Sequence, residues 1–319
     1  MSLRTQRLTA RIGTELAGKR LDQALALLFP DFSRSRLQRW LKEERVRLDG
    51  HDCRPRDRVA GGEEVVLDAC FEERGGCLPQ AIELDIVHED AHILVVNKPV
   101  GLVVHPAAGN PDGTLQNALL HHAPALVELP RGGIVHRLDK ETSGLLVVAK
   151  TPAAHRALVE QLQARLFHRE YRAVVTGVVT AGGSVEALIG RHPTQRTRMA
   201  VVHSGKPALT HYRVLERFRL HSYLKINLET GRTHQIRVHM AHIRHPLVGD
   251  PLYGGRFRIP PDSPAAFVEA LRDYRRQALH ALRLGLSHPH SSEWMAWEAP
   301  LPEDLAALLE LLREDAARG

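Results

Sequence analysis

One segment, residues 133–149, joins a charged loop to an apolar strand and constrains the fold more than any other part of the chain. Asp139 follows the basic pair His136 and Arg137, and the small residues 142–144 form a turn. The apolar, partly β-branched run 145–149 is typical of a buried strand. A lone loop aspartate usually caps a turn or faces water. However, Asp139 lies in a loop beside a strand, and catalytic residues are often found in loops that a rigid scaffold positions.

The pattern after residue 82 predicts strands interspersed with helices. Strands are expected at about 82–88, 92–97, 144–150, 169–178, 207–219 and 222–229, and helices at about 115–122, 152–167, 233–244 and 302–314. Thr151-Pro152 is a favourable helix start, because a capping hydroxyl precedes a proline in the first turn. Hairpin spacing favours an α+β fold over a regular doubly wound sheet. We therefore expect a mixed, mainly antiparallel sheet with flanking helices.

The first 75 residues are predicted to form a separate small α+β domain. It comprises an apolar helix over 20–29, a second helix over 33–43 and a strand over 45–49. On the second helix Leu37, Trp40 and Leu41 share one face, and basic residues recur on the other. Residues 76–82 are predicted to be a linker, which leaves 83–319 as the second domain.

Several longer strings follow one another along residues 85–300. In chain order they are 95–106 (VVNKPVGLVVHP), 133–146 (GIVHRLDKETSGLL), 169–175 (REYRAVV), 230–239 (TGRTHQIRVH), 276–281 (RQALHA) and 288–289 (HP). Together they resemble the motif set of the RluA-type pseudouridine synthases. The resemblance implies an enzyme that isomerises uridines to pseudouridine, with large-subunit (23S) ribosomal RNA or a large-subunit assembly intermediate as its partner.

The resemblance also implies site residues. Asp139 matches the catalytic nucleophile, Arg237 its cationic partner, and Tyr171 the aromatic residue beside the target ring. Position alone would make Tyr171 an ordinary core aromatic of a strand. Substrate contacts are expected from the residues that flank these positions in the motifs, namely Arg137, His136, Thr142, Arg232, Thr233, His234 and Gln235. The target nucleotide must leave its stack, because stacking hides the bond to be cut.

The N-terminal domain is similar to an S4 domain, an RNA-binding module. Between residues 34 and 58 there are nine Lys and Arg against five Asp and Glu. Such a pattern is also compatible with an ordinary solvated surface. The RNA-binding residues that the similarity implies are Arg34, Arg36, Arg39 and Lys42. Glu44 stands where the S4 pattern usually has a glycine, which normally supplies an unusual backbone angle.

Neither a cofactor nor a metal is expected. Isomerisation requires no redox change and no group donor. The histidines His234, His239, His242 and His245 lack an HExxH pattern and any cysteine or carboxylate to complete a ligand set. The cysteines Cys53, Cys70 and Cys77 are odd in number and have no CxxC spacing. We expect a reducing, cytoplasmic environment.

Charge and composition agree with a polyanionic partner. The net charge is +6, and aromatic residues are only 5%, so a broad base-stacking platform is not expected. The stretch 188–215 has no acidic residue, and its basic side chains suit either a solvated loop or an RNA-backbone track. No apolar run approaches a membrane span, and the N-terminus has no signal-peptide pattern. We expect a monomer.

Three alternatives remain at this stage. The same family chemistry could act on another structured RNA such as tRNA. A non-catalytic S4-type RNA-binding protein would not require Asp139, Tyr171 and Arg237 together. A nucleoside or RNA hydrolase would use Asp139 with water as acceptor, but the sequence shows no paired carboxylate suited to activating that water.

Overall fold

The computed structural model describes residues 3–30, 32, 34–72, 77–107, 109–195, 197–255 and 257–318. Side chains at 3, 4, 34, 35 and 70–72 are also outside the description. The side chain of Arg34, an expected RNA contact, therefore lies outside the described residues, as does the first residue of the predicted linker. The chain divides into two compact units, Met1–Gly76 and Cys77–Gly319.

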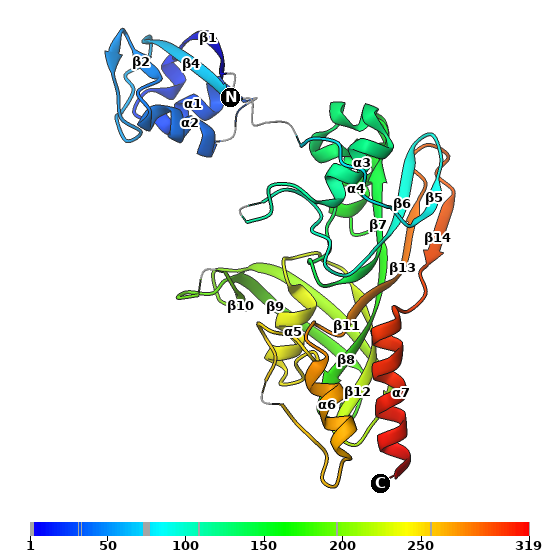
Figure 1. Cartoon of the computed structure of the whole chain (residues 1–319). Coiled ribbons are helices and arrows are strands. Elements are labelled where there is room, and N and C mark those ends of the chain that lie inside the picture. The colour runs from blue at the N-terminus through cyan, green and yellow to red at the C-terminus, as the bar shows by residue number, and fades with distance from the viewer. Residues whose placement is uncertain are drawn as a thin grey trace. The chain divides into compact units, whose positions relative to one another are not determined.

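The N-terminal unit packs two helices on an antiparallel sheet (Figure 1). The sheet order is β1(Leu3–Arg11), β4(Glu64–Glu72), β2(Val46–Leu48), β3(His51–Asp52), and the helices are α1(Leu21–Leu28) and α2(Arg34–Lys42). Leu37, Trp40 and Leu41 are at most 3% exposed, as their shared helix face predicts. Glu44 has φ 57°, so it adopts the left-handed conformation that glycine would take without strain.

The larger unit is built on a ten-stranded sheet, and the predicted α+β class is confirmed. Its main order is β10(Met199–Val201), β9(Gly183–Arg191), β11(Lys206–Arg217), β12(His221–Leu228), β8(His168–Thr176), β13(Leu279–Ser287), β7(Ser143–Ala149), β6(Ile93–Lys98), β5(Ile86–Glu89), with β14(Trp294–Glu298) on β13. All described pairs in it are antiparallel except β7 with β13. Gly144 has φ 112°, and an added Cβ would lie 2.2 Å from the Ala281 carbonyl oxygen, so this close pairing requires glycine.

Alternating residues of the central strands bury both faces of the sheet. Leu94 and Tyr171 belong to a core shared with α3(Leu115–His122) and α5(Gln235–His242). Ile93 instead packs with α4(Pro152–Gln163), and Val174 with α6(Ala265–Asp273) and α7(Glu303–Arg318). Figure 1 shows α7 running beside the sheet. This period of two places Tyr171 on the face that α5 covers.

Some predicted elements differ from the observed ones. The helix over 115–122 is observed at those bounds, and Thr151 caps α4 by accepting from the Ala154 amide at 3.1 Å. The acid-free stretch 188–215 is not a loop throughout, because it contains the end of β9, all of β10 and most of β11. Arg196, one of its basic residues, lies outside the described part of the chain. Helix α6 was not predicted.

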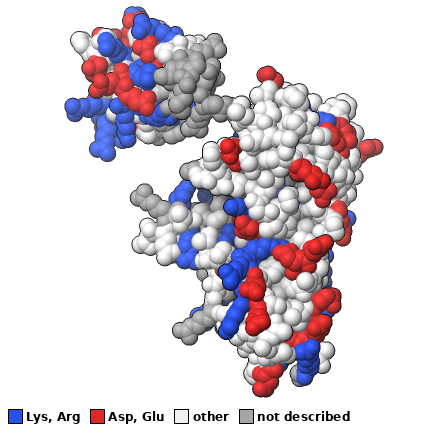
Figure 2. Space-filling model, in the orientation of Figure 1, with Lys and Arg blue, Asp and Glu red and all other residues white. Residues whose placement is uncertain are grey.

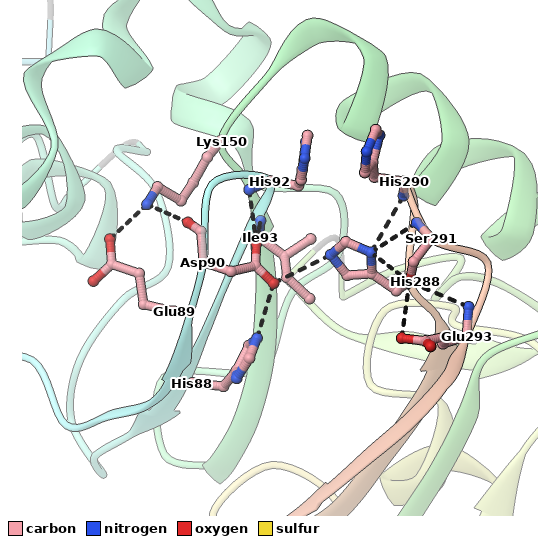
Figure 3. Close-up of polar contacts among 10 residues, drawn as sticks. All are labelled: His88, Glu89, Asp90, His92, Ile93, Lys150, His288, His290, Ser291 and Glu293. Carbon is pink, nitrogen blue, oxygen red and sulfur yellow. Dashed lines mark hydrogen bonds and ion pairs between the residues drawn. The ribbon is translucent and has the colours of Figure 1, made fainter.

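A carboxylate in the turn between β5 and β6 contacts a second turn that is distant in the sequence (Figure 3). Asp90 Oδ1 accepts from the amides of His92 and Ile93 at 2.7 and 2.8 Å. Its Oδ2 lies 3.0 Å from His88 Nε2 and 3.1 Å from His288 Nε2. His288 stands in the turn between β13 and β14, so Asp90 ties that turn to the β5–β6 hairpin.

Candidate active site

A cavity of about 610 Å³ opens on the larger unit, and three motif segments form most of its wall. They are the loop before β7, the start of β8 and the segment from the end of β12 into α5. The cavity wall includes every predicted catalytic and substrate-contacting residue, namely Asp139, Tyr171, Arg237, His136, Arg137, Thr142, Arg232, Thr233, His234 and Gln235. The fold therefore brings together Asp139 and Arg237, which are 98 positions apart in the chain.

The loop that carries Asp139 is held from below by a buried lysine. Lys98 is 1% exposed, and its ammonium donates to the carbonyls of Pro99, Leu102 and Lys140 at 2.7, 3.0 and 3.0 Å. Three carbonyl acceptors match the three N–H donors of an ammonium group. The NKP string of the sequence thus fixes the backbone immediately after Asp139.

The RQALHA string holds the same loop from the sheet side. Arg276 donates to the Glu141 carbonyl at 3.3 Å, and Gln277 donates to the Thr142 hydroxyl at 3.1 Å. His280 Nδ1 lies 2.9 Å from the Ser143 hydroxyl. These contacts give the string a positioning role that the sequence did not reveal. They also occupy the Thr142 side chain, which is 2% exposed, so we assign it to the loop rather than to a ligand.

Arg237 is shared between two carboxylates. Its Nη1 donates to Asp139 Oδ2 at 3.0 Å, while Nε and Nη2 make a two-point contact with Asp250 at 2.7 and 2.9 Å. Burial by itself raises the pKa of Asp250, but the Arg237 hydrogen bonds outweigh it and hold that pKa below its usual value. Asp250 thus fixes the guanidinium and leaves Nη1 to donate to Asp139.

Asp250 and Tyr253 were not predicted as site residues from the sequence. Asp250 also accepts from the amides of Leu252 and Tyr253 at 2.9 and 3.0 Å, and the Tyr253 ring lies 5.0 Å from the Arg237 guanidinium carbon. The sequence could have indicated a second partner for Arg237. A buried arginine has five N–H donors, which is more than one catalytic carboxylate accepts. The Gly-Asp-Pro turn at 249–251 supplies that second carboxylate.

His234 lies at the start of α5 and next to the acid. It has φ 56°, its Nδ1 is 2.8 Å from the Tyr253 hydroxyl, and its Nε2 is 3.8 Å from Asp139 Oδ1. Burial lowers the pKa of this imidazole, although the Asp139 charge opposes the shift. Asp139 Oδ1 therefore has no close donor among the described residues.

The remaining polar residues of the cavity divide into buried and exposed ones. Burial raises the pKa of the Tyr171 phenol, and burial together with the Arg169 charge lowers the pKa of His136 to about 3. His136 Nε2 accepts from the Val147 amide at 3.1 Å, which suits a neutral ring. Arg137, Arg232 and Thr233 are exposed at the cavity mouth.

Gln235 has no capacity left for a ligand. Its amide contacts the Thr230 hydroxyl at 2.8 Å, the Arg232 amide, the Leu209 carbonyl and the Thr210 hydroxyl, the last three at 3.0 Å. The side chain is 3% exposed. We therefore assign Gln235 to shaping the 230–232 turn instead of the predicted substrate contact.

Basic side chains also gather on the N-terminal unit (Figure 2). Arg36, Arg39 and Lys42 are exposed on α2. Arg39 pairs with Glu43 at 2.8 Å, and the Arg36 guanidinium lies over the Trp40 ring at 5.7 Å. In the larger unit, Figure 2 shows basic and acidic side chains grouped together across the middle of the view.

The histidines near α5 do not form a metal site within the described residues. No group of three or more His, Cys, Asp or Glu side chains there is arranged to hold a metal ion. His239 is fully buried, and its Nδ1 lies 2.9 Å from the Thr210 hydroxyl. Among the described helices, none is both long enough and apolar enough to span a membrane.

Two family models match the chain. The model described as RNA pseudouridylate synthase covers residues 92–242, and the S4 domain model covers residues 19–65. The first range contains Asp139, Tyr171 and Arg237 but ends before Asp250. The second contains α1, α2 and β2.

Named proteins resemble the chain over nearly its whole length. Ribosomal large subunit pseudouridine synthase D of Pseudomonas aeruginosa is 60% identical over 306 residues, which is 96% of each chain. The protein of the same name from Escherichia coli O6:H1 is 57% identical and covers 99% of this chain and 97% of its own. Among solved structures, Human RNA Pseudouridylate Synthase Domain Containing 4 has a TM-score of 0.57 at 25% identity, covering 72% of this chain and 92% of its own.

Proposed function

The chain belongs to the RNA pseudouridylate synthase family, and from that premise we propose that it converts uridines of large-subunit ribosomal RNA to pseudouridines. The names of the relatives support the choice of RNA, and the S4 domain supports an RNA substrate in general. One observation carries the proposed chemistry: the Asp139 carboxylate faces a cavity, and within the described part of the chain its single close donor is Arg237 at 3.0 Å.

The reaction moves one bond and exchanges one proton. The C1′–N1 bond breaks, a C1′–C5 bond forms, C5 loses a proton, and N1 gains one. We assign Asp139 as the nucleophile that bonds to C1′, because no described residue donates closely to its Oδ1. Arg237 keeps this carboxylate oriented, and Asp250 keeps Arg237 in place.

Tyr171 and Arg137 suit the handling of a flipped nucleotide. The raised pKa of Tyr171 keeps its phenol neutral, so its ring offers an apolar face to uracil. Arg137 is exposed at the mouth, where it can contact a phosphate or fill the space that the base vacates. Arg232, Thr233 and His234 border the same opening.

We assign RNA affinity to residues 1–75 and chemistry to residues 83–319, joined by the linker 76–82. Arg36, Arg39 and Lys42 suit contacts with phosphates, because they project from one exposed helix face. The proposed enzyme acts as a cytoplasmic monomer without a cofactor. Its partner is ribosomal RNA or a large-subunit assembly intermediate.

Pseudouridine mapping tests the proposal directly. Ribosomal RNA from cells with and without the gene is compared, and the missing sites are then restored by the purified full chain in vitro. Product of unchanged mass is expected at specific large-subunit positions. Loss of sites in tRNA alone would redirect the proposal to another RNA, and release of free uracil would indicate a hydrolase.

A further inference from the structure

One buried cation of the cavity has no partner of opposite charge. Among the described residues three arginines are buried, Arg169, Arg237 and Arg276, at 7%, 4% and 6% exposure. Arg237 has Asp250 as a two-point partner, and Arg276 contacts Asp304 at 2.5 and 2.6 Å. In the described part of the chain, Arg169 forms no ion pair. Its one hydrogen bond runs from Nη2 to the Glu229 carbonyl at 3.2 Å, and its Nε has no partner.

Such an arrangement is costly for the protein alone. Desolvating a charge costs on the order of several kcal/mol unless a counter-charge and hydrogen bonds offset it. An unbalanced buried cation in a cavity therefore indicates a ligand that supplies the missing acceptor. Arginine has donors only, so this ligand must present an oxygen acceptor with full or partial negative charge.

The segment after β12 leaves space for the Arg169 guanidinium at Gly231. A Cβ added to Gly231 would lie 2.8 Å from Arg169 Nη1, and Gly231 does not have the positive φ that favours glycine. A larger residue at position 231 would therefore require the Arg169 side chain to shift, whereas the backbone itself does not favour glycine there. Both residues line the same cavity as Asp139.

The position of Arg169 indicates which part of the nucleotide it contacts, the base or a phosphate. Arg169 and Tyr171 are two residues apart on β8, so they project from the same face of the sheet. Exposed arginines at the mouth, Arg137 and Arg232, are accessible to phosphates. Arg169 is instead buried, and it shares a sheet face with Tyr171, the residue assigned to the uracil ring.

We propose that Arg169 is a catalytic residue that binds a carbonyl oxygen of the flipped uracil and stabilises its anion. This rests on the proposed function. When an Asp139 oxygen bonds to C1′, the electrons of the C1′–N1 bond pass to N1 and spread over O2 and O4. No proton moves in this step. A fixed cation beside the developing charge lowers the barrier, since it needs no reorganisation at the moment of cleavage.

The test compares the full-length wild type with Arg169→Met, Arg169→Lys and the matched control Arg172→Met. Arg172 lies on the same strand, pairs with Glu170 at 2.5 Å and does not line the cavity. Single-turnover rates, RNA affinity and thermal midpoints are measured on an RNA that carries a mapped target uridine. Arg169→Met is expected to slow the reaction about 100-fold or more, with Arg169→Lys recovering part of the rate.

The thermal midpoint separates a functional from a structural arginine. Removing an unbalanced buried charge should leave the midpoint unchanged or raise it, whereas loss of a structural contact lowers it. RNA affinity should stay within about threefold, well under the tenfold that corresponds to about 1.4 kcal/mol. Arg172→Met should change neither the rate nor the affinity by more than about threefold.

Modified RNA substrates show whether Arg169 contacts the base or the phosphate of the target nucleotide. Sulfur replaces O2 or O4 of the target uracil in two RNAs, and a methylphosphonate replaces its 5′-phosphate in a third. One thiocarbonyl should slow the wild type, and Arg169→Met should lose that sensitivity. An Arg169→Met rate within threefold of wild type, or loss of sensitivity to the methylphosphonate alone, would overturn the inference. An inactive wild type would instead refute the proposed function.

Discussion

Asp90 and Asp139 stand before neighbouring antiparallel strands, β6 and β7, yet they are surrounded very differently. Asp90 accepts two backbone amides on one oxygen and two imidazoles on the other, all within 3.1 Å (Figure 3). Among the described residues, Asp139 has Arg237 at 3.0 Å on Oδ2 and only His234, at 3.8 Å, near Oδ1. The first carboxylate joins two turns, and the second faces a cavity.

The difference shows how one residue type serves structure or chemistry. A carboxylate whose oxygens are both fully engaged has no lone pair aimed at a substrate and is stabilised as an anion. Burial alone raises the pKa of Asp90, but the hydrogen bonds from His88 and the backbone reverse this and hold it far below its usual value. A nucleophile needs the opposite arrangement, with one oxygen oriented and the other unoccupied.

The largest contrast is expected from matched Asn substitutions. Asp139→Asn should reduce pseudouridine formation by about a thousandfold or more, because an amide of similar shape is not a nucleophile. Asp90→Asn should stay within a few-fold of wild type at a temperature where it remains folded. Turnover on ribosomal RNA measures both. Comparable losses in the two variants would show that the comparison of the two carboxylates is mistaken.

The cation beside the nucleophile gives the next effect. Arg237→Met should lower the single-turnover rate about 100-fold while RNA affinity changes by less than about tenfold, or about 1.4 kcal/mol. Asp139 would lose its one close donor, and Asp250 would be left buried without its partner. Rapid quench and filter binding measure the two quantities. A variant that binds RNA poorly but reacts normally at saturation would make Arg237 a phosphate anchor.

Asp90 should matter for stability in a pH-dependent way. Asp90→Asn leaves imidazole donors without their acceptor, at a cost of about 1–3 kcal/mol for a part-buried site. The folded-state pKa of Asp90 is depressed, so its contribution is present above the unfolded pKa of about 4 and is lost as pH falls.

Urea unfolding of the larger unit at pH 7, 4 and 3 measures this contribution. The gap between wild type and Asp90→Asn should be widest at pH 7 and should narrow toward pH 3. A gap that widened on acidification would mean that His88 and His288 do not depend on an anionic Asp90.

The smallest effect is expected at a third acidic residue, Glu44. There the backbone conformation affects stability more than the carboxylate does. Glu44→Gly should stabilise the N-terminal unit by up to about 1 kcal/mol, since relief of the left-handed strain exceeds the entropy that glycine costs. The reverse change at Gly50, which has φ 79°, provides the control, and Gly50→Ala should destabilise. Thermal unfolding of both variants checks the pair.

The sequence predicted the elements whose formation depends on adjacent residues. The helix over 115–122, the Thr151 cap and the strand after Asp139 each depend on a few adjacent residues. The convergence of motifs on one cavity followed from the family resemblance, since no local pattern shows that Asp139 and Arg237 meet. The partner of Arg237 was missed because Asp250 lies in an ordinary turn. The Asp90–His288 contact spans 198 positions, and only the assembled sheet brings its two ends together.

The sharing of Arg237 has a consequence for the movement of charge during the reaction. Asp139, Arg237 and Asp250 together carry one negative charge. Once Asp139 bonds to the ribose under the proposed chemistry, that charge resides on uracil, and Arg237 remains neutralised by Asp250. The cleavage step therefore transfers charge across a few ångströms inside the cavity without changing its total. Such an internal transfer is little screened by dissolved ions, so salt should govern how RNA arrives far more than how it reacts.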